Sequence, residues 1–168
     1  MKIKYALALA ALLAAPVSAG AMDSATLQDH PGKYRPVYAS EMGVVYADVD
    51  TIVLGDPVPG QLPMLQADLY AEVYEPIPTY DNISSGNLVQ YVFAYHTKLL
   101  AVHKVKGNTG RLTYYIDNRL TGTYDKDGNP ATAKPMPGME KEPFQIGAEA
   151  EDLYLNLYRQ VGQLGIKN

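Results

Sequence analysis

The residues of this chain that stand in patterns suited to chemistry are carboxylates, histidines and tyrosines, and the sequence contains no cysteine and no tryptophan. The sharpest local pattern is Asp125-Lys126-Asp127-Gly128-Asn129, which matches the opening of an EF-hand calcium loop. Such a loop needs a glycine at its sixth position and a bidentate glutamate at its twelfth. Pro130 and Met136 stand there instead. We therefore expect an ordinary turn, since Asp-Gly and Gly-Asn pairs tolerate positive φ.

Three histidines are the next candidates: His30, His96 and His103. His96 and His103 are seven residues apart, so they would point to opposite faces of one continuous strand, although they could meet across a hairpin. No further ligand residues accompany them, and a chain without cysteine forms no disulfide, thiolate metal site or covalent haem link. We therefore predict no metal site and no cofactor.

Four carboxylates lie in strand-like sequence: Asp48, Asp50, Asp68 and Glu72. Carboxylates two or four residues apart on a strand mark its solvent-exposed face, and whether any two of these converge on a site is left open. The sequence has no G-x-S-x-G nucleophile elbow, no Walker loop and no G-x-G-x-x-G motif. The interpretation is a protein that is not an enzyme and has no catalytic residue.

The clearest element is a strand over Leu65 to Tyr74, in which apolar residues alternate strictly with polar residues and tyrosines. Period-two alternation predicts a sheet with one buried and one exposed face. Tyr70 and Tyr74 share the predicted exposed face with Asp68 and Glu72. They form a candidate contact surface, although cross-strand packing explains them equally well.

Further strand-like stretches surround this element and are separated by proline, glycine and polar residues. They begin at Tyr34 and include Gly43 to Ile52, Leu88 to Tyr95, Lys98 to Val105 and Arg111 to Tyr124, with a tight connection at Gly107 to Gly110. A helix follows, because apolar residues recur at helical spacing: Ala150, Leu153, Tyr154, Leu157, Tyr158 and Val161. The predicted fold class is α+β, an antiparallel β-sheet packed against one C-terminal α-helix.

The first 21 residues have the features of a cleavable secretory signal peptide. Lys2 and Lys4 precede an apolar run of 11 residues, which is too short to cross a membrane core that needs about 20. Small residues follow, and Ala19-Gly20-Ala21 fits cleavage between Ala21 and Met22, with cleavage before Gly20 as the alternative. The predicted organisation is a signal peptide over 1–21, a flexible lead-in over 22–33 and a single domain over 34–168.

The charge and composition of the chain restrict the classes of partner that we expect. Without Lys2 and Lys4 the 14 basic residues become 12, against 18 acidic ones, which gives a net charge of −6. Nucleic-acid binders are usually basic, so no nucleic-acid partner is expected. No segment of the mature chain is apolar enough for stable membrane insertion. We expect a protein located in the periplasm, on the cell surface or outside the cell.

The order of these motifs resembles the surface-adhesin protein E group of small exported bacterial proteins. The resemblance rests on Tyr46 to Ile52, the alternating strand, the Tyr124 to Gly128 turn and the stretch from Phe144 to Tyr158. This chain lacks the tryptophans, the late cysteine and the lipidation site common in that group. The resemblance implies a sheet with a helix and a role in binding host matrix proteins, and no binding residues carry over.

Three functions follow as hypotheses. The first is an exported, non-enzymatic binding or adhesion module that contacts a host or envelope protein. The second is a periplasmic accessory or assembly factor that binds a small ligand or a partner protein. The third is an unrecognised hydrolase, because a fold alone does not exclude an active site.

Overall fold

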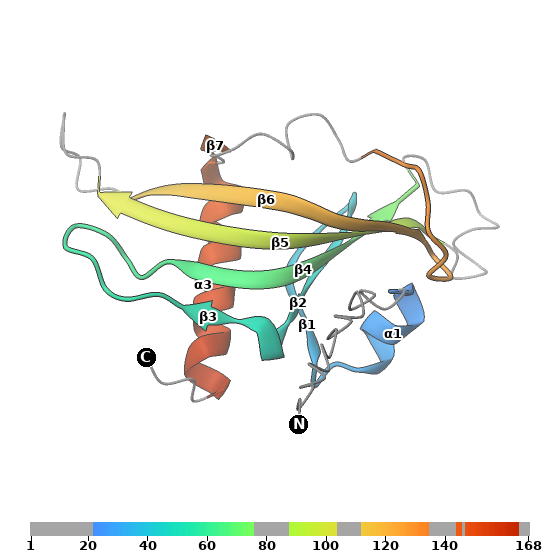
Figure 1. The fold of residues 1–168 in the computed structure, drawn as a ribbon, viewed down its shortest axis with the longest axis horizontal. Coiled ribbons are helices and arrows are strands. Elements are labelled where there is room, and N and C mark those ends of the chain that lie inside the picture. The colour runs from blue at the N-terminus through green and yellow to red at the C-terminus, as the bar shows by residue number, and fades with distance from the viewer. Residues whose placement is uncertain (1–21, 76–87, 104–111, 135–143, 146, 165–168) are drawn as a thin grey trace, which may run out of the picture.

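The computed structural model describes residues 22–75, 88–103, 112–134, 144–145 and 147–164, which form one antiparallel sheet with a helix on each face (Figure 1). The order of strands in the described sheet is β1-β2-β4-β5-β6-β7, and β3 pairs with β4 beyond the end of β2. The strands are β1 (Tyr34–Ser40), β2 (Gly43–Asp48), β3 (Val53–Leu54), β4 (Leu65–Tyr74), β5 (Val89–His103), β6 (Leu112–Asp125) and β7 (Phe144–Gln145). This arrangement confirms the predicted α+β class.

The predicted strand over Leu65 to Tyr74 is confirmed with the same bounds. The sequence predicted two separate strands for the region that follows, and this was wrong, because β5 is one continuous strand of 15 residues. No proline or glycine interrupts Val89–His103, and β6 pairs with it from Tyr91 to His103. The predicted connection at residues 107–110 lies outside the described residues.

The C-terminal helix α3 (Gly147–Leu164) packs across one face of the sheet. Five of the six residues in the predicted apolar stripe are buried, namely Ala150, Leu153, Tyr154, Leu157 and Val161. They meet apolar side chains of the strands in the main core, among them Leu65, Leu99 and Ile116. The sixth, Tyr158, is 46% exposed and stacks on Tyr154. No helix in the described part of the chain is long and apolar enough to cross a membrane.

The structure differs from the prediction at residues 22–33, where a flexible lead-in was expected. Helix α1 (Ser24–Asp29) lies there, on the sheet face opposite α3 (Figure 1). The Asp23 carboxylate caps it by accepting the Thr26 amide at 2.6 Å, and Leu27 is fully buried. A helix of six residues is too short for apolar periodicity to reveal it, and its stability comes from the cap and from packing.

Candidate functional site

A row of three polar residues crosses the centre of the sheet on the face that carries α1. Asp68 of β4 is the register partner of His96 on β5, and His96 is the partner of Arg119 on β6. Ala67 and Leu69, on either side of Asp68, belong to the core beneath α3. Because side chains alternate along a strand, Asp68 points to the opposite face. Three separate strands thus place an acid, an imidazole and a guanidinium side by side.

The first two members of this row form a hydrogen-bonded pair. The Asp68 Oδ1 atom lies 2.8 Å from Nδ1 of His96, and the two side chains are 41% and 36% exposed. An ionised carboxylate can only accept hydrogen bonds, so the shared proton belongs to the His96 Nδ1 atom. The other ring nitrogen, Nε2, is then left for a further partner.

Arg119 stands apart from this pair. Arg119 is exposed, and its guanidinium forms no ion pair with any carboxylate in the described ranges. Asp117, two residues away on β6, is the register partner of Lys98. Arg119 therefore lines the site without an ion-pair partner among the described residues.

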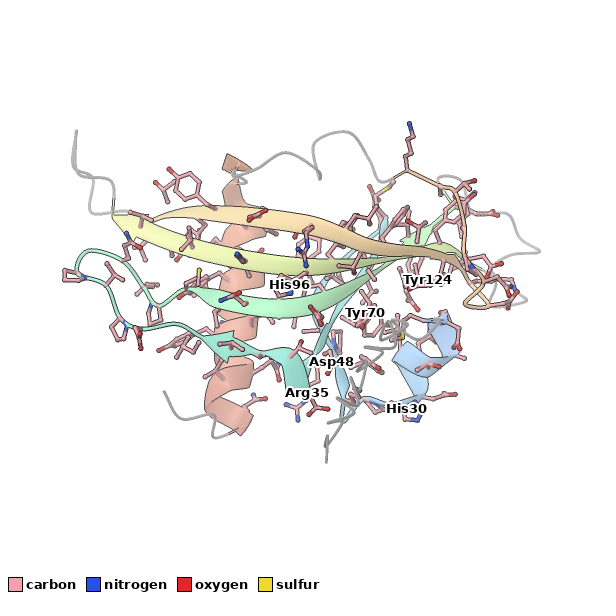
Figure 2. All side chains as sticks on the ribbon, viewed as in Figure 1. His30, Arg35, Asp48, Tyr70, His96 and Tyr124 are labelled. Carbon is pink, nitrogen blue, oxygen red and sulfur yellow. The ribbon has the colours of Figure 1, made fainter. Side chains whose placement is uncertain are left out.

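A cavity of about 290 Å³ opens beside the row, and we call it the open-face pocket. Figure 2 shows His96, Tyr70 and Tyr124 along this face, between the centre of the sheet and α1. The cavity is lined by residues of β4, β5 and β6: Asp68, Tyr70, Ala94, Tyr95, His96, Arg119, Thr121 and Tyr124.

Two small residues account for the hollow. Ala94 and Gly122 are register partners at its centre, so neither strand fills the space with a large side chain. A Cβ atom on Gly122 would lie 2.6 Å from the Tyr124 hydroxyl oxygen, because the Tyr124 ring folds back over this glycine. The glycine thus allows the ring to lie against the sheet and form a wall of the pocket.

A β-bulge in β6 sets the direction of the Thr121 side chain. Ala94 pairs with Gly122, but Tyr95 pairs with Leu120, so Thr121 is an extra residue on β6. Bulges redirect side chains and increase local twist. The exposed Thr121 side chain lines the pocket as a result.

Tyr70 provides an aromatic wall with a protonated hydroxyl. Its ring packs edge-to-face on Tyr34, with 5.6 Å between the ring centroids. Burial, and next the neighbouring Tyr34 and Asp48, raise the pKa of Tyr70 to about 12. The phenol therefore remains a neutral donor and acceptor at physiological pH. Of the two predicted contact tyrosines, Tyr70 lines the pocket, whereas Tyr74 packs against the apolar cluster beneath α1.

The four carboxylates predicted on strands do not converge on one site, and Asp50 lies in the 3-10 helix Val49–Thr51 rather than on a strand. Only Asp68 lines the pocket. Asp48 is buried and lies 3.6 Å from the Lys33 ammonium, which raises the pKa of that lysine. Asp50 is exposed.

Glu72 was expected on a solvent-exposed face, and this was wrong: it is 1% exposed. Helix α1 covers it, with Ser24 Oγ at 2.5 Å and Gln28 Nε2 at 3.1 Å from its Oε1 atom. On the other side the Tyr46 hydroxyl donates to Oε2 at 3.3 Å. Burial, and next the Glu72 charge, raise the pKa of Tyr46 to about 12, so this hydroxyl keeps its proton.

The calcium-like motif forms the predicted turn. The Asp125 Oδ1 atom accepts the amides of Asp127 and Asn129 at 3.0 and 2.9 Å, and Gly128 has φ of +84°. Hydrogen bonds from Asn129 lower the pKa of Asp125. Among the described residues no group of three or more His, Cys, Asp or Glu side chains could hold a metal ion.

Sequence reasoning singled out Asp68, Tyr70 and His96 but not Arg119, Thr121 or Tyr124 as site residues. The signal that could have found them is the pair of small residues, Ala94 and Gly122, in strands otherwise rich in large side chains.

Comparisons with protein-family models, with curated proteins and with solved structures found no match to this chain. The resemblance to the surface-adhesin protein E group therefore stays a prediction.

Proposed function

We propose that this protein is an exported, non-enzymatic binding module that holds a small ligand in the open-face pocket. The observation that carries the proposal is the cavity of about 290 Å³ with an unpaired arginine, an Asp–His pair and tyrosine walls. Small-molecule sites are concave, usually about 300–1,000 Å³, and combine aromatic walls with a few placed polar groups. The cavity lies just below that range, which suits a small metabolite.

A host or envelope protein is the other partner expected from the sequence. Stable protein interfaces bury about 800 Å² on each side around exposed aromatic or arginine anchors. Tyr70 and Tyr74 are half-buried among their neighbours, so they offer little free ring surface to a partner. The geometry therefore favours the small ligand, and the adhesion role remains a hypothesis.

Filling the pocket should abolish ligand binding without unfolding the protein. Thr121 is exposed, so Thr121→Trp places a large ring over the cavity at little cost to the core. A ligand at one hundred times its Kd stabilises a protein by about 2.7 kcal/mol, which raises Tm by roughly 5–10 °C for a domain of this size. In a thermal-shift screen of small metabolites, we expect hits with the wild type and none of the same hits with Thr121→Trp.

Lys98→Trp is the matched control, because Lys98 is exposed on β5, on the same face but outside the pocket. It should keep the ligand-induced shift. Equal shifts in all three proteins would show that the ligand binds elsewhere and would contradict the proposal.

Acid–base catalysis is a second candidate, favoured by the 2.8 Å contact between Asp68 and His96 at the edge of a cavity. A carboxylate that orients an imidazole makes up two of the three members of a hydrolytic triad. The hits of the same screen separate the two functions. A ligand recovered unchanged after long incubation supports binding alone, whereas its conversion by the wild type but not by His96→Ala supports an enzyme.

Export is supported by the signal-like sequence of residues 1–21. Met22, the predicted first residue of the mature protein, is 7% exposed and belongs to the same apolar cluster as Leu27. N-terminal sequencing of exported protein should begin at Met22, or else at Gly20. Replacing Ala19 and Ala21 with phenylalanine should leave the precursor uncut. Exported material that begins at Met1 would contradict this proposal.

A further inference from the structure

We propose that the ligand of the open-face pocket is a small aromatic carboxylate, held by Arg119 through its acid group and by the tyrosine walls through its ring. This inference rests on the proposed small-ligand function and goes beyond it by naming the chemical class.

The charge of the site points to an anion. Two of the acids near the pocket have partners: Asp68 is paired with His96 at 2.8 Å, and Asp48 lies 3.6 Å from Lys33. Asp117, two residues from Arg119 on β6, forms no ion pair among the described residues, and its Oδ1 atom is buried without a hydrogen-bond partner. Arg119 has no ion-pair partner among the described residues, yet it lines the cavity. A guanidinium presents a planar fork of donors that fits a carboxylate with two parallel hydrogen bonds. A carboxylate on a ligand can therefore form the ion pair that Arg119 lacks within the described residues.

Apart from the Asp68 carboxylate, which accepts only and is bound to His96, the other polar groups in the pocket can donate a hydrogen bond. Thr121 and Tyr124 contribute hydroxyls, and the Tyr70 phenol stays protonated because its pKa is raised to about 12. Donors suit a ligand rich in acceptor oxygens. The His96 Nε2 atom is the exception, since it can accept from a ligand hydroxyl while Nδ1 holds Asp68.

The shape of the pocket points to a flat ring. Tyr70 and Tyr124 line it, and Ala94 and Gly122 leave its floor free of bulky side chains. Aromatic pairs in offset or edge-to-face contact are stabilised beyond the area they bury. A volume of about 290 Å³ limits the ligand to a small ring with few substituents.

Four probes that differ in charge or ring separate these contributions. Benzoate has both the ring and the acid, benzamide has the ring without charge, benzylamine has the ring with the opposite charge, and acetate has the acid alone. In amide chemical-shift titrations of the purified protein, we expect benzoate to bind more tightly than the other three. The shifted amides should lie around Ala94 and Thr121, on the two strands that form the bulge.

Arg119→Gln should weaken benzoate binding by about tenfold or more, because a hydrogen bond to a charged group contributes about 1.5–3 kcal/mol. The same change should leave benzamide binding unaltered. Lys98→Gln removes an exposed cation from the same face outside the pocket and is the control. It should bind benzoate like the wild type.

Two results would overturn the inference, and they differ in what they leave standing. If benzamide or benzylamine binds the pocket as tightly as benzoate, or if Arg119→Gln changes nothing, the ligand is not an anion but the pocket is still a binding site. If none of the four probes shifts a pocket amide and the metabolite screen is also empty, the proposed function fails together with the inference.

Discussion

Replacing Leu157 with alanine is expected to lower the free energy of unfolding by about 2–5 kcal/mol, through lost burial and the cavity left behind. Leu157 is 0% exposed and lies on α3 against the main core. A domain of this kind has only about 5–15 kcal/mol of stability in total. The chain contains no cysteine, so no disulfide compensates. Urea denaturation of the mutant should show a clear fall in the midpoint, and Leu153→Ala should behave similarly.

Asp152→Ala is the control, because Asp152 is exposed on the same helix and alanine is a good helix former. It should change the midpoint little. If Leu157→Ala and Asp152→Ala unfold at the same urea concentration, α3 does not stabilise the sheet and the packing described above is wrong.

Asn156 shows why a helix control must be chosen from the structure. Because Asn156 lies outside the apolar stripe of α3, the sequence pattern predicts that it is exposed and that its replacement by alanine changes the stability little. In the structure its Nδ2 atom donates to the Val37 carbonyl of β1 at 2.8 Å. This hydrogen bond connects α3 to the outer strand β1, so Asn156→Ala should lower the free energy of unfolding by about 1 kcal/mol.

The sequence predicts which residues share a face of a strand but not which residues lie beside one another on different strands. Alternation places Asp68 opposite the buried residues Ala67 and Leu69, as the structure confirms. Its neighbours His96 and Arg119 follow from the register of two long hairpins, and register depends on turns and loops that alternation does not describe. The bulge at Thr121 shifts the pairing by one more residue. Alternation alone therefore could not predict the pocket.

Glu72 shows a different limit. Its position on an alternating strand correctly placed it on the face away from α3. The prediction of exposure failed because six residues from the N-terminal region fold over that face as α1. A buried carboxylate is costly unless it is hydrogen-bonded, so this residue must have a structural reason to be there.

The second prediction with a large effect on stability is the replacement of Glu72. Glu72→Ala should lower the free energy of unfolding by about 3 kcal/mol, because it removes hydrogen bonds to a charged group and leaves the buried Tyr46 hydroxyl without its acceptor. The donors are the side chains of Ser24, Gln28 and Tyr46. Two of them belong to α1, so the loss should appear first as release of this helix. Hydrogen exchange of the amides over residues 24–29 should accelerate strongly in the mutant.

Glu72→Gln separates the loss of charge from the loss of the bonds. A glutamine keeps the shape and one oxygen acceptor for Ser24 and Gln28, and the Tyr46 hydroxyl can rotate to accept from the new amide. It should therefore lose less than half as much stability as Glu72→Ala.

The release of α1 also has a consequence at the pocket, because Ala94 and Tyr124 line the pocket and pack in the cluster that contains Leu27. Glu72→Ala should accordingly weaken ligand binding several-fold, although Glu72 does not line the pocket. Unchanged exchange of the α1 amides in Glu72→Ala would show that packing of Leu27 alone holds the helix, and the carboxylate would then have no part in shaping the site.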